Sequence, residues 1–527
     1  MELVAILFAL TVGGLLLTAA AEWMRIPAPV LICLYGLALA LVPGVPPLDI
    51  DPEHLLPILL PPLLWAAARK SSWRHFAANW RPILLLAVIL VFVTTAAVAA
   101  LAATISPALP VAAAIVLGAI VAPPDAAAIS AVAGRLGLPR KLVTILEGEG
   151  LFNDVTALTL YNVAVMGVVS GSISIWFSAG LFVYSAAAAT LIGLGIGFVL
   201  YKLVALVRDS RVSTALGLTA PYIAYLVAEA VHASGVLAVI CAAFFIMARS
   251  NDPDDFEGRL VQGSVWEVAE TVLNALTFGL VGMELVDIIQ AVDYGFGEML
   301  WKALAIAGAV IAVRILWLGL AILFGRMGIG WKELGDHPRM AVVTAWAGMR
   351  GVVTIVTALA LPTYIADGSP FPGREQIQFL AVVVVLATLV AQGLTLPGLI
   401  ELLGVKSDAD KESQDLHAIM NEAAKAAYAR LGELRESGEV DDEVAAKMQR
   451  WYDRRGEQVA ALVEDRENPE NEALASRIDA MQRLESELLT AATARVLAMR
   501  SQPGRDPALV DRVLASFDHR AVGRNHR

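Results

Sequence analysis

Three carboxylates interrupt an apolar run from Leu142 to Met166 that is long enough to cross a bilayer. They are Glu147, Glu149 and Asp154, and Asn153 precedes the last of them. An ionised carboxylate at a bilayer centre costs roughly 3 kcal/mol on insertion scales. Such residues persist when they face a protein interior or a wet cavity, and they then mark a path for ions or protons. The run therefore predicts an ion-translocation site.

Asp154 has the chemistry to exchange a proton for a cation. Its carboxylate oxygens are ligands for a hard cation, and the amide carbonyl of Asn153 adds a neutral oxygen. Burial disfavours the charged form of a carboxyl group, so a buried Asp can also hold a proton near neutral pH. A site that binds either a proton or a cation, and that faces each side of the membrane in turn, would exchange one proton for one monovalent cation without moving net charge. The alternative is that Asp154 only forms a salt bridge within the bundle.

Two other apolar runs are interrupted near their middles. One contains Ala122-Pro123-Pro124-Asp125, and the other contains Gly348-Met349-Arg350-Gly351. Proline removes helical hydrogen bonds, and the freed carbonyls need another partner such as a cation or water. Paired interruptions in corresponding spans are the best sequence pointer to a transporter's binding site. Asp125 either shares the cation site or binds backbone N–H groups that the break leaves free.

The remaining charges within apolar runs need partners. A pair of buried charges is less costly than two lone ones, so Glu149 and Arg350 are predicted to form a structural ion pair. The sequence assigns no partner to Arg314. Snorkelling to the membrane surface or an aqueous funnel explains a further set of acidic residues near span ends equally well. This set is Glu229, Glu267, Glu270 and Glu284.

The apolar runs that position these residues predict an all-α polytopic membrane protein. The chain is 57% hydrophobic and only 17% charged, against about 25% charged in soluble domains. We expect thirteen transmembrane helices, arranged as two inverted six-helix repeats joined by the seventh, with the two interrupted helices crossing. The expected spans are 3–21, 28–42, 54–69, 82–104, 110–133, 142–166, 176–205, 214–231, 234–249, 265–285, 298–324, 338–360 and 376–402.

Loop charges predict the orientation of this domain. Loops after odd-numbered spans contain fifteen Lys and Arg residues, whereas loops after even-numbered spans contain only Arg374. Cytoplasmic loops carry the excess of Lys and Arg, so the N-terminus is expected outside and the C-terminus inside. Residues 1–402 form the expected transmembrane domain and 403–527 a cytoplasmic helical tail, in which charged residues dominate. The tail is either a regulatory or dimerising segment or a solvated helical extension.

Composition excludes several other classes of protein. Cys33 and Cys241 both lie in apolar runs, which favours neither a disulfide framework nor a metal cage. A net charge of −11 offers no basic patch for nucleic acid. No nucleophile–base set and no cofactor motif is evident, so we expect neither an enzyme nor a bound cofactor, only transported cation and H⁺.

With these motifs in order, the sequence resembles bacterial sodium/proton antiporters of the monovalent cation:proton antiporter-1 family, in the sodium/proton exchanger superfamily. That family's S-P-T-D-P corresponds to Ala122-Pro123-Pro124-Asp125-Ala126, and its G-E-S-L-x-N-D corresponds to residues Gly148 to Asp154. Its P-P-L-L-F, S-G-V-L-A-V and G-[LM]-R-G correspond to residues 61–65, 234–239 and 348–351. The order and spacing agree from about residue 3 to residue 402.

The resemblance implies a mobile core domain, a dimerisation domain, homodimers and elevator-like alternating access. It implies that Asp154 binds the ion, with Asn153 and Asp125 beside it, and that Glu149 pairs with Arg350. An Asn-Asp pair resembles the electroneutral branch of the family. Pro124 and Gly150 replace two hydroxyl residues of the motifs, and Ala66 stands where some members carry an acid. The choice among sodium, lithium and potassium therefore stays open.

The sequence thus predicts an electroneutral antiporter that exchanges Na⁺, or Li⁺, for H⁺ across the plasma membrane in pH and salt homeostasis. The alternatives are a K⁺/H⁺ antiporter on the same scaffold and a non-transporting cation or pH sensor. Membrane lipids and a second copy of the chain are the expected partners, and the tail is a candidate for binding a regulator.

Overall fold

The computed structural model describes two compact units, Met1–Lys406 and Ser407–Arg527. Within them, the residues described are 2–24, 27–43, 45, 52–70, 73–125, 138–170, 175–207, 210–249, 256–291, 295–326, 338–365, 368–405, 425–438, 440–441 and 443–450. Each unit is considered by itself below.

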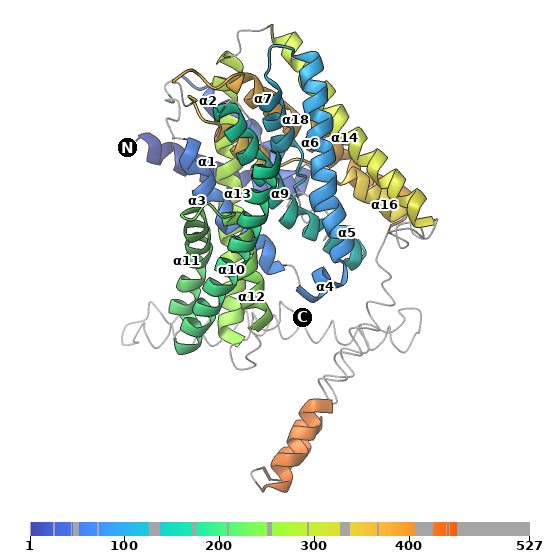
Figure 1. The fold of residues 1–527 in the computed structure, drawn as a ribbon. Coiled ribbons are helices and arrows are strands. Elements are labelled where there is room, and N and C mark those ends of the chain that lie inside the picture. The colour runs from blue at the N-terminus through green and yellow to red at the C-terminus, as the bar shows by residue number, and fades with distance from the viewer. Residues whose placement is uncertain are drawn as a thin grey trace. The chain divides into compact units, whose positions relative to one another are not determined.

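The first unit is built from helices, as predicted, and an isolated bridge between Tyr364 and Pro370 is the only β pairing among its described residues (Figure 1). Its elements are α1 (Glu2–Met24), α2 (Ala28–Ala40), α3 (Pro52–Lys70), α4 (Trp73–Ala78), α5 (Trp80–Leu84), the π-helix η1 (Leu85–Ile89), α6 (Leu90–Ile105), α7 (Val111–Val121), α9 (Arg140–Ser170), α10 (Ile175–Leu206), α11 (Ser210–Glu229), α12 (Gly235–Arg249), α13 (Phe256–Ala291), α14 (Phe296–Arg326), α16 (Pro338–Trp346), α17 (Val352–Leu359) and α18 (Arg374–Leu403).

Seven of the described helical segments are long and apolar enough to cross a bilayer. They are Val4–Ala21, Trp80–Ile105, Lys141–Val169, Gly180–Leu206, Gln262–Val286, Phe296–Phe324 and Arg374–Leu403. Three shorter apolar helices, α2, α7 and α12, fall below a full bilayer thickness. Each of the thirteen expected spans overlaps a helix, but the count of thirteen crossings and the inverted repeat stay predictions.

Helices end at both of the predicted breaks. Helix α7 ends at Val121, and residues 122–125 are not helical. Helix α16 ends at Trp346, and α17 begins at Val352 after five non-helical residues. The two breaks touch, because the Asp125 N–H donates a hydrogen bond of 2.7 Å to the Met349 carbonyl. The second half of the expected span 110–133 lies outside the described residues.

Helix α9 lies between two hydrophobic clusters. One cluster gathers around α7, whose Val116, Leu117 and Ile120 are almost fully buried, and it includes Leu146 of α9. The other joins α3, α10, α11 and α12, and it includes Leu151 of α9. Figure 1 shows α10, α11 and α12 side by side in this second group. A helix that is apolar on all sides is buried, which places the break after α7 inside the bundle.

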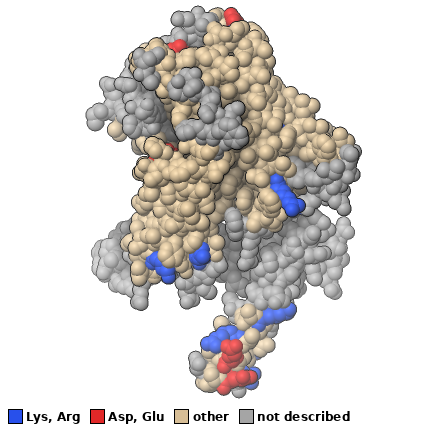
Figure 2. Space-filling model, in the orientation of Figure 1, with Lys and Arg blue, Asp and Glu red and all other residues tan. Residues whose placement is uncertain are grey.

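Charged side chains separate along the first unit. On the face shown in Figure 2, its Lys and Arg side chains lie toward the lower end of the helices, and Asp and Glu side chains lie at the upper end. Exposed apolar side chains of the first unit include Phe8, Leu191 and Leu316. In the second unit, the described residues form helices over 425–436 and 443–450.

Candidate functional site

A small cavity lies where the two helix breaks meet α3, α9 and α13. Its volume is about 80 Å³. Asp125, Asp154, Glu270, Asn274 and Thr354 are the polar side chains among the described residues that line it. The other lining residues are Leu60, Leu63, Leu64, Ala67, Pro123, Pro124, Gly150, Leu151, Gly351, Val352 and Val353. The cavity therefore brings together Asp125 and Asp154, two residues predicted to bind the ion.

Asp154 and Asn153 are held inside the bundle by α9. Asp154 is 6% exposed and lines the cavity, and Asn153 is fully buried beside it. The Asn153 Nδ2 group donates a hydrogen bond of 2.7 Å to the Pro124 carbonyl, which ties α9 to the break after α7. The Asn153 Oδ1 atom has no hydrogen-bond donor among the described residues. Asn153 itself is not among the described residues that line the cavity.

Asp125 lies against the start of α17. An added Cβ at Gly351, the residue before α17, would overlap the Asp125 carboxylate. The first N–H groups of a helix lack helical partners and carry partial positive charge, which favours a carboxylate at this position. Asp125 lines the cavity and also lies at a helix N-terminus, so both roles considered for it stay predictions.

Glu149 is paired with Arg314, so the predicted ion pair between Glu149 and Arg350 is wrong. The Arg314 Nη1 and Nη2 groups donate to the two carboxylate oxygens of Glu149, the second at 2.8 Å. Both side chains are 1% exposed. Arg314 Nε also donates to the Thr344 carbonyl at 3.1 Å, which fixes α14 against α16. A bidentate guanidinium–carboxylate pair is the strong form of this interaction.

Arg350 caps helix ends with its guanidinium group. Its Nε donates to the Val121 carbonyl and its Nη2 to the Ala122 carbonyl, both at 3.0 Å, and its Nη1 donates to the Gly348 carbonyl. The last carbonyls of a helix have no helical partners and carry partial negative charge, so a cation there is stabilising. The planar fork of Arg supplies several donors at once. Because the Arg350 guanidinium is occupied by the carbonyls at the end of α7, it does not pair with Glu149.

Gly348 leaves room for the Arg314 side chain. A Cβ at Gly348 would overlap the Cδ atom and come very close to the Nε atom of Arg314. The absence of a side chain at Gly348 leaves room for Arg314 to reach Glu149. Gly348 itself is not among the described residues that line the cavity. Pro123, Pro124 and Gly351 line the cavity directly.

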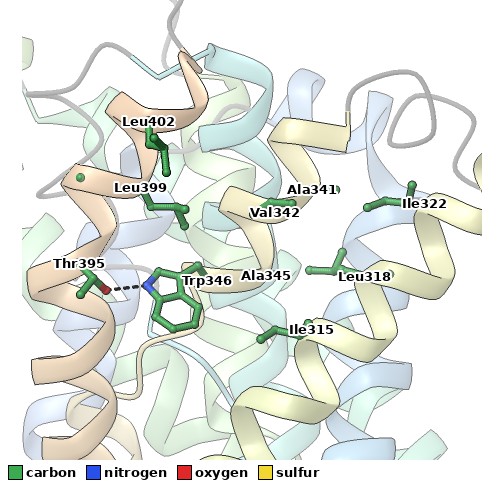
Figure 3. Close-up of a pocket in the computed structure, with 12 residues that line it drawn as sticks. Ile315, Leu318, Ile322, Ala341, Val342, Ala345, Trp346, Thr395, Leu399 and Leu402 are labelled. Carbon is green, nitrogen blue, oxygen red and sulfur yellow. Dashed lines mark hydrogen bonds between the residues drawn. The ribbon is translucent and has the colours of Figure 1, made fainter.

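A larger cavity of about 480 Å³ lies between α14, α16 and α18 (Figure 3). Its lining residues are almost all apolar, as Ile315, Leu318 and Leu399 show in Figure 3. Thr395 is a polar residue there, and its Oγ1 accepts a hydrogen bond of 2.8 Å from Trp346 Nε1. Among the described residues this cavity offers no carboxylate, so the smaller cavity is the candidate cation site.

Glu270 and Asn274 also line this cavity, although the sequence assigned Glu270 no specific role and did not identify Asn274. The position of Glu270 near the end of a predicted span allowed snorkelling as well as an aqueous funnel. The structure places it in the cavity of Asp125 and Asp154, four residues before Asn274. Spacing by four residues puts both side chains on one helix face, a signal that could have been found in the sequence.

A bundle of membrane-length helices, with carboxylates lining a cavity where two helix breaks meet, is the arrangement of a membrane transport protein. The family model for the sodium/hydrogen exchanger, transmembrane, matches residues 6–402. The chain belongs to the sodium/hydrogen exchanger family.

Relatives and a solved structure agree with this assignment. An uncharacterized Na⁺/H⁺ exchanger of Mycobacterium tuberculosis, Rv2287, is 31% identical over 98% of this chain and 94% of the relative. A sodium, potassium, lithium and rubidium/H⁺ antiporter of Bacillus pumilus is 30% identical over 75% of this chain and 60% of the relative. The sodium proton antiporter MjNhaP1 from Methanocaldococcus jannaschii, at pH 8, matches with a TM-score of 0.62 and 20% identity. That match covers 77% of this chain and all of the other, and it shows the likeness of fold.

Proposed function

We propose that the protein exchanges one Na⁺ or Li⁺ for one H⁺ across the plasma membrane, and that cation and proton compete at Asp154. The observation that carries this proposal is that buried Asp154 and half-buried Asp125 line one cavity at the two helix breaks. Membership of the sodium/hydrogen exchanger family supports cation/proton antiport as the general activity.

The competition follows from the chemistry of the site. The carboxylate oxygens of Asp154 and the Asn153 Oδ1 atom are ligands that suit a hard monovalent cation. A protonated Asp154 loses the negative charge that attracts the cation. If only Asp154 changes its load, each cycle moves one positive charge in each direction, and the exchange is electroneutral.

Potassium is the second candidate cation. Two relatives, from Bacillus pumilus and Bacillus subtilis, are named as sodium, potassium, lithium and rubidium/H⁺ antiporters. Gly150 lies in the cavity at a position with no side-chain hydroxyl to ligate a small cation. Fewer fixed ligands weaken the preference for a small cation, so a broad selectivity that includes K⁺ is compatible with this cavity.

The proposal includes an orientation and an assembly. The bias of Lys and Arg toward loops after odd-numbered spans supports an outside N-terminus and a cytoplasmic C-terminus. The gathering of basic side chains at one end of the helices agrees with that bias (Figure 2). We further propose a homodimer in the membrane, with thirteen crossings and an inverted repeat as the arrangement of the first unit.

The test is proton flux in proteoliposomes with an imposed pH gradient. Na⁺, Li⁺ or K⁺ is added in turn, and the Na⁺ and Li⁺ arms are repeated with the membrane potential clamped by potassium and valinomycin. We expect Na⁺-dependent flux that is insensitive to the clamp. Flux with K⁺ alone would establish the K⁺/H⁺ alternative, and no flux with any cation in folded protein would support the sensor.

Asp154→Asn is the matched variant for this test. It keeps the size of the side chain but removes the group that titrates, so we expect exchange to fall to the level of protein-free liposomes. Thermal melting in detergent checks that the variant is folded. Exchange at the normal rate in folded Asp154→Asn would contradict the assignment of Asp154 as the exchanging group.

A further inference from the structure

One face of α13 carries polar side chains at Gln262, Glu270 and Asn274. Gln262, Trp266, Glu270 and Asn274 follow one another at intervals of four residues, which places them along one face of the helix. Glu270 and Asn274 lie at the cavity that holds Asp125 and Asp154. A face of this kind on a membrane-length helix is costly unless it borders protein or water.

The N-terminal part of this face is closed by side chains from α3. The Arg69 Nη1 group donates to the Gln262 carbonyl at 3.4 Å, and the Arg69 guanidinium lies 5.8 Å from the centre of the Trp266 ring. Trp65 packs against Trp266 with ring centres 6.4 Å apart, and Trp266 is only 5% exposed. Glu270 lies one turn after Trp266 in α13, and it lines the cavity.

The charged residues among those described in the cavity lining are all acidic. Asp125, Asp154 and Glu270 contribute three carboxyl groups, and no Lys or Arg is present among the described residues that line it. A concave site with low-dielectric walls and charges of one sign concentrates counter-ions. The buried Asn153 Oδ1 atom, which has no donor among the described residues, belongs to the residue next to Asp154 in α9.

We propose that Glu270 and Asn274 bind the transported cation across the cavity from the helix breaks, and that Glu270 sets cation affinity. This inference rests on the proposed cation/proton exchange. The cation would be held between α13 on one side and Asp125 and Asp154 on the other. Asp154 remains the group that exchanges its load, while Glu270 lowers the cation concentration needed to fill the site.

The experiment compares Glu270→Gln with Glu267→Gln in proteoliposomes. Glu267 lies on the same helix, three residues earlier, but is exposed and does not line the cavity. For Glu270→Gln we expect the KM for Na⁺ to rise about tenfold, because losing one interaction with a charged group is worth about 1.4 kcal/mol or more. The maximal rate should stay within about twofold, and Glu267→Gln should match the wild type. Asn274→Ala should raise KM by less, because it removes a neutral ligand.

The controls separate this inference from the proposed function. Stabilisation of the detergent-solubilised protein by Na⁺, measured as a shift in Tm, reports binding without transport, and Glu270→Asp should restore part of the affinity. If wild type exchanges cations but Glu270→Gln and Glu267→Gln share its KM, this inference is wrong and the proposed function stands. Wild type that shows neither exchange nor stabilisation by any cation would overturn both. If Glu270→Gln is unfolded, a wild-type KM in Glu270→Asp and Asn274→Ala together would also overturn the inference.

Discussion

At the scale of single residues, the two buried arginines have different partners and different roles. Arg314 neutralises Glu149 with two parallel hydrogen bonds, whereas the Arg350 guanidinium donates to backbone carbonyls and thereby caps α7. Both are 1% exposed. Residue type alone could not distinguish them, because each is an arginine within an apolar run. Arg350 reaches the end of α7 and binds its carbonyls, and Glu149 pairs with Arg314 instead.

Removal of Arg314 should be strongly destabilising. Arg314→Ala leaves Glu149 buried without its counter-charge, and breaking a buried pair in this way costs about 3–5 kcal/mol. The measurement is thermal melting in detergent. Adding Glu149→Gln should recover much of the loss, because the unpaired charge is then absent. Arg350→Ala combined with Glu149→Gln is the control and should show no such recovery, since those two side chains are not paired. Equal recovery in both combinations would contradict the observed pairing.

At the scale of elements, hydrogen bonds join the break after α7 to the break before α17. The Asp125 N–H to Met349 carbonyl bond, the bond from Asn153 to Pro124 and the three bonds from Arg350 hold them together. Backbone groups released by a broken helix must find partners inside a membrane protein. Here they are used to fix the position of the two aspartates.

Gly351→Ala should impair transport more than folding. The new methyl group would overlap the Asp125 carboxylate and displace it from the cavity. A misplaced ligand can cost about 100-fold in rate, so we expect a loss of exchange of at least that order in the proteoliposome assay. Gly308→Ala in α14 is the matched control, because a Cβ there meets no atom within 4 Å. Normal exchange in Gly351→Ala would show that the position of Asp125 is unimportant for transport.

At the scale of the whole molecule, the cavity and both breaks lie in the unit Met1–Lys406. The sodium/hydrogen exchanger family match ends at residue 402, within the same unit. The second unit therefore contains none of the residues proposed to bind the ion. Its described helices, 425–436 and 443–450, are short and rich in charged residues.

Deletion of residues 407–527 should leave cation-dependent exchange intact. The remaining unit keeps every ligand of the cavity and every contact between the breaks. We expect the truncated protein to reach a maximal rate within about twofold of the full chain, with proteoliposome flux as the measurement and Asp154→Asn in the truncated chain as the control. A truncated protein that is folded but does not exchange would show that the tail is needed for turnover, as an active regulatory segment would be.

The sequence by itself determined the class of protein and predicted a site at Asp125 and Asp154, two residues that line one cavity. Hydropathy placed the helices, because a bilayer demands long apolar runs whose backbone bonds are all internal. Proline and glycine placed the two breaks, and the cost of burying charge identified Asp154 and Asp125. These signals are local, since each depends on residues close together in the chain.

Only the tertiary structure decided which charges meet. Glu149 lies 165 residues from Arg314 and 201 from Arg350, and hydrophobic pattern carries no information about which one reaches it. Likewise, the role of Glu270 near the end of a predicted span was ambiguous from the sequence, and the packing of α13 against α3 and α17 places it in the cavity. The physical reason is that buried charges choose partners by three-dimensional proximity and by competing demands, such as the free carbonyls at the end of α7.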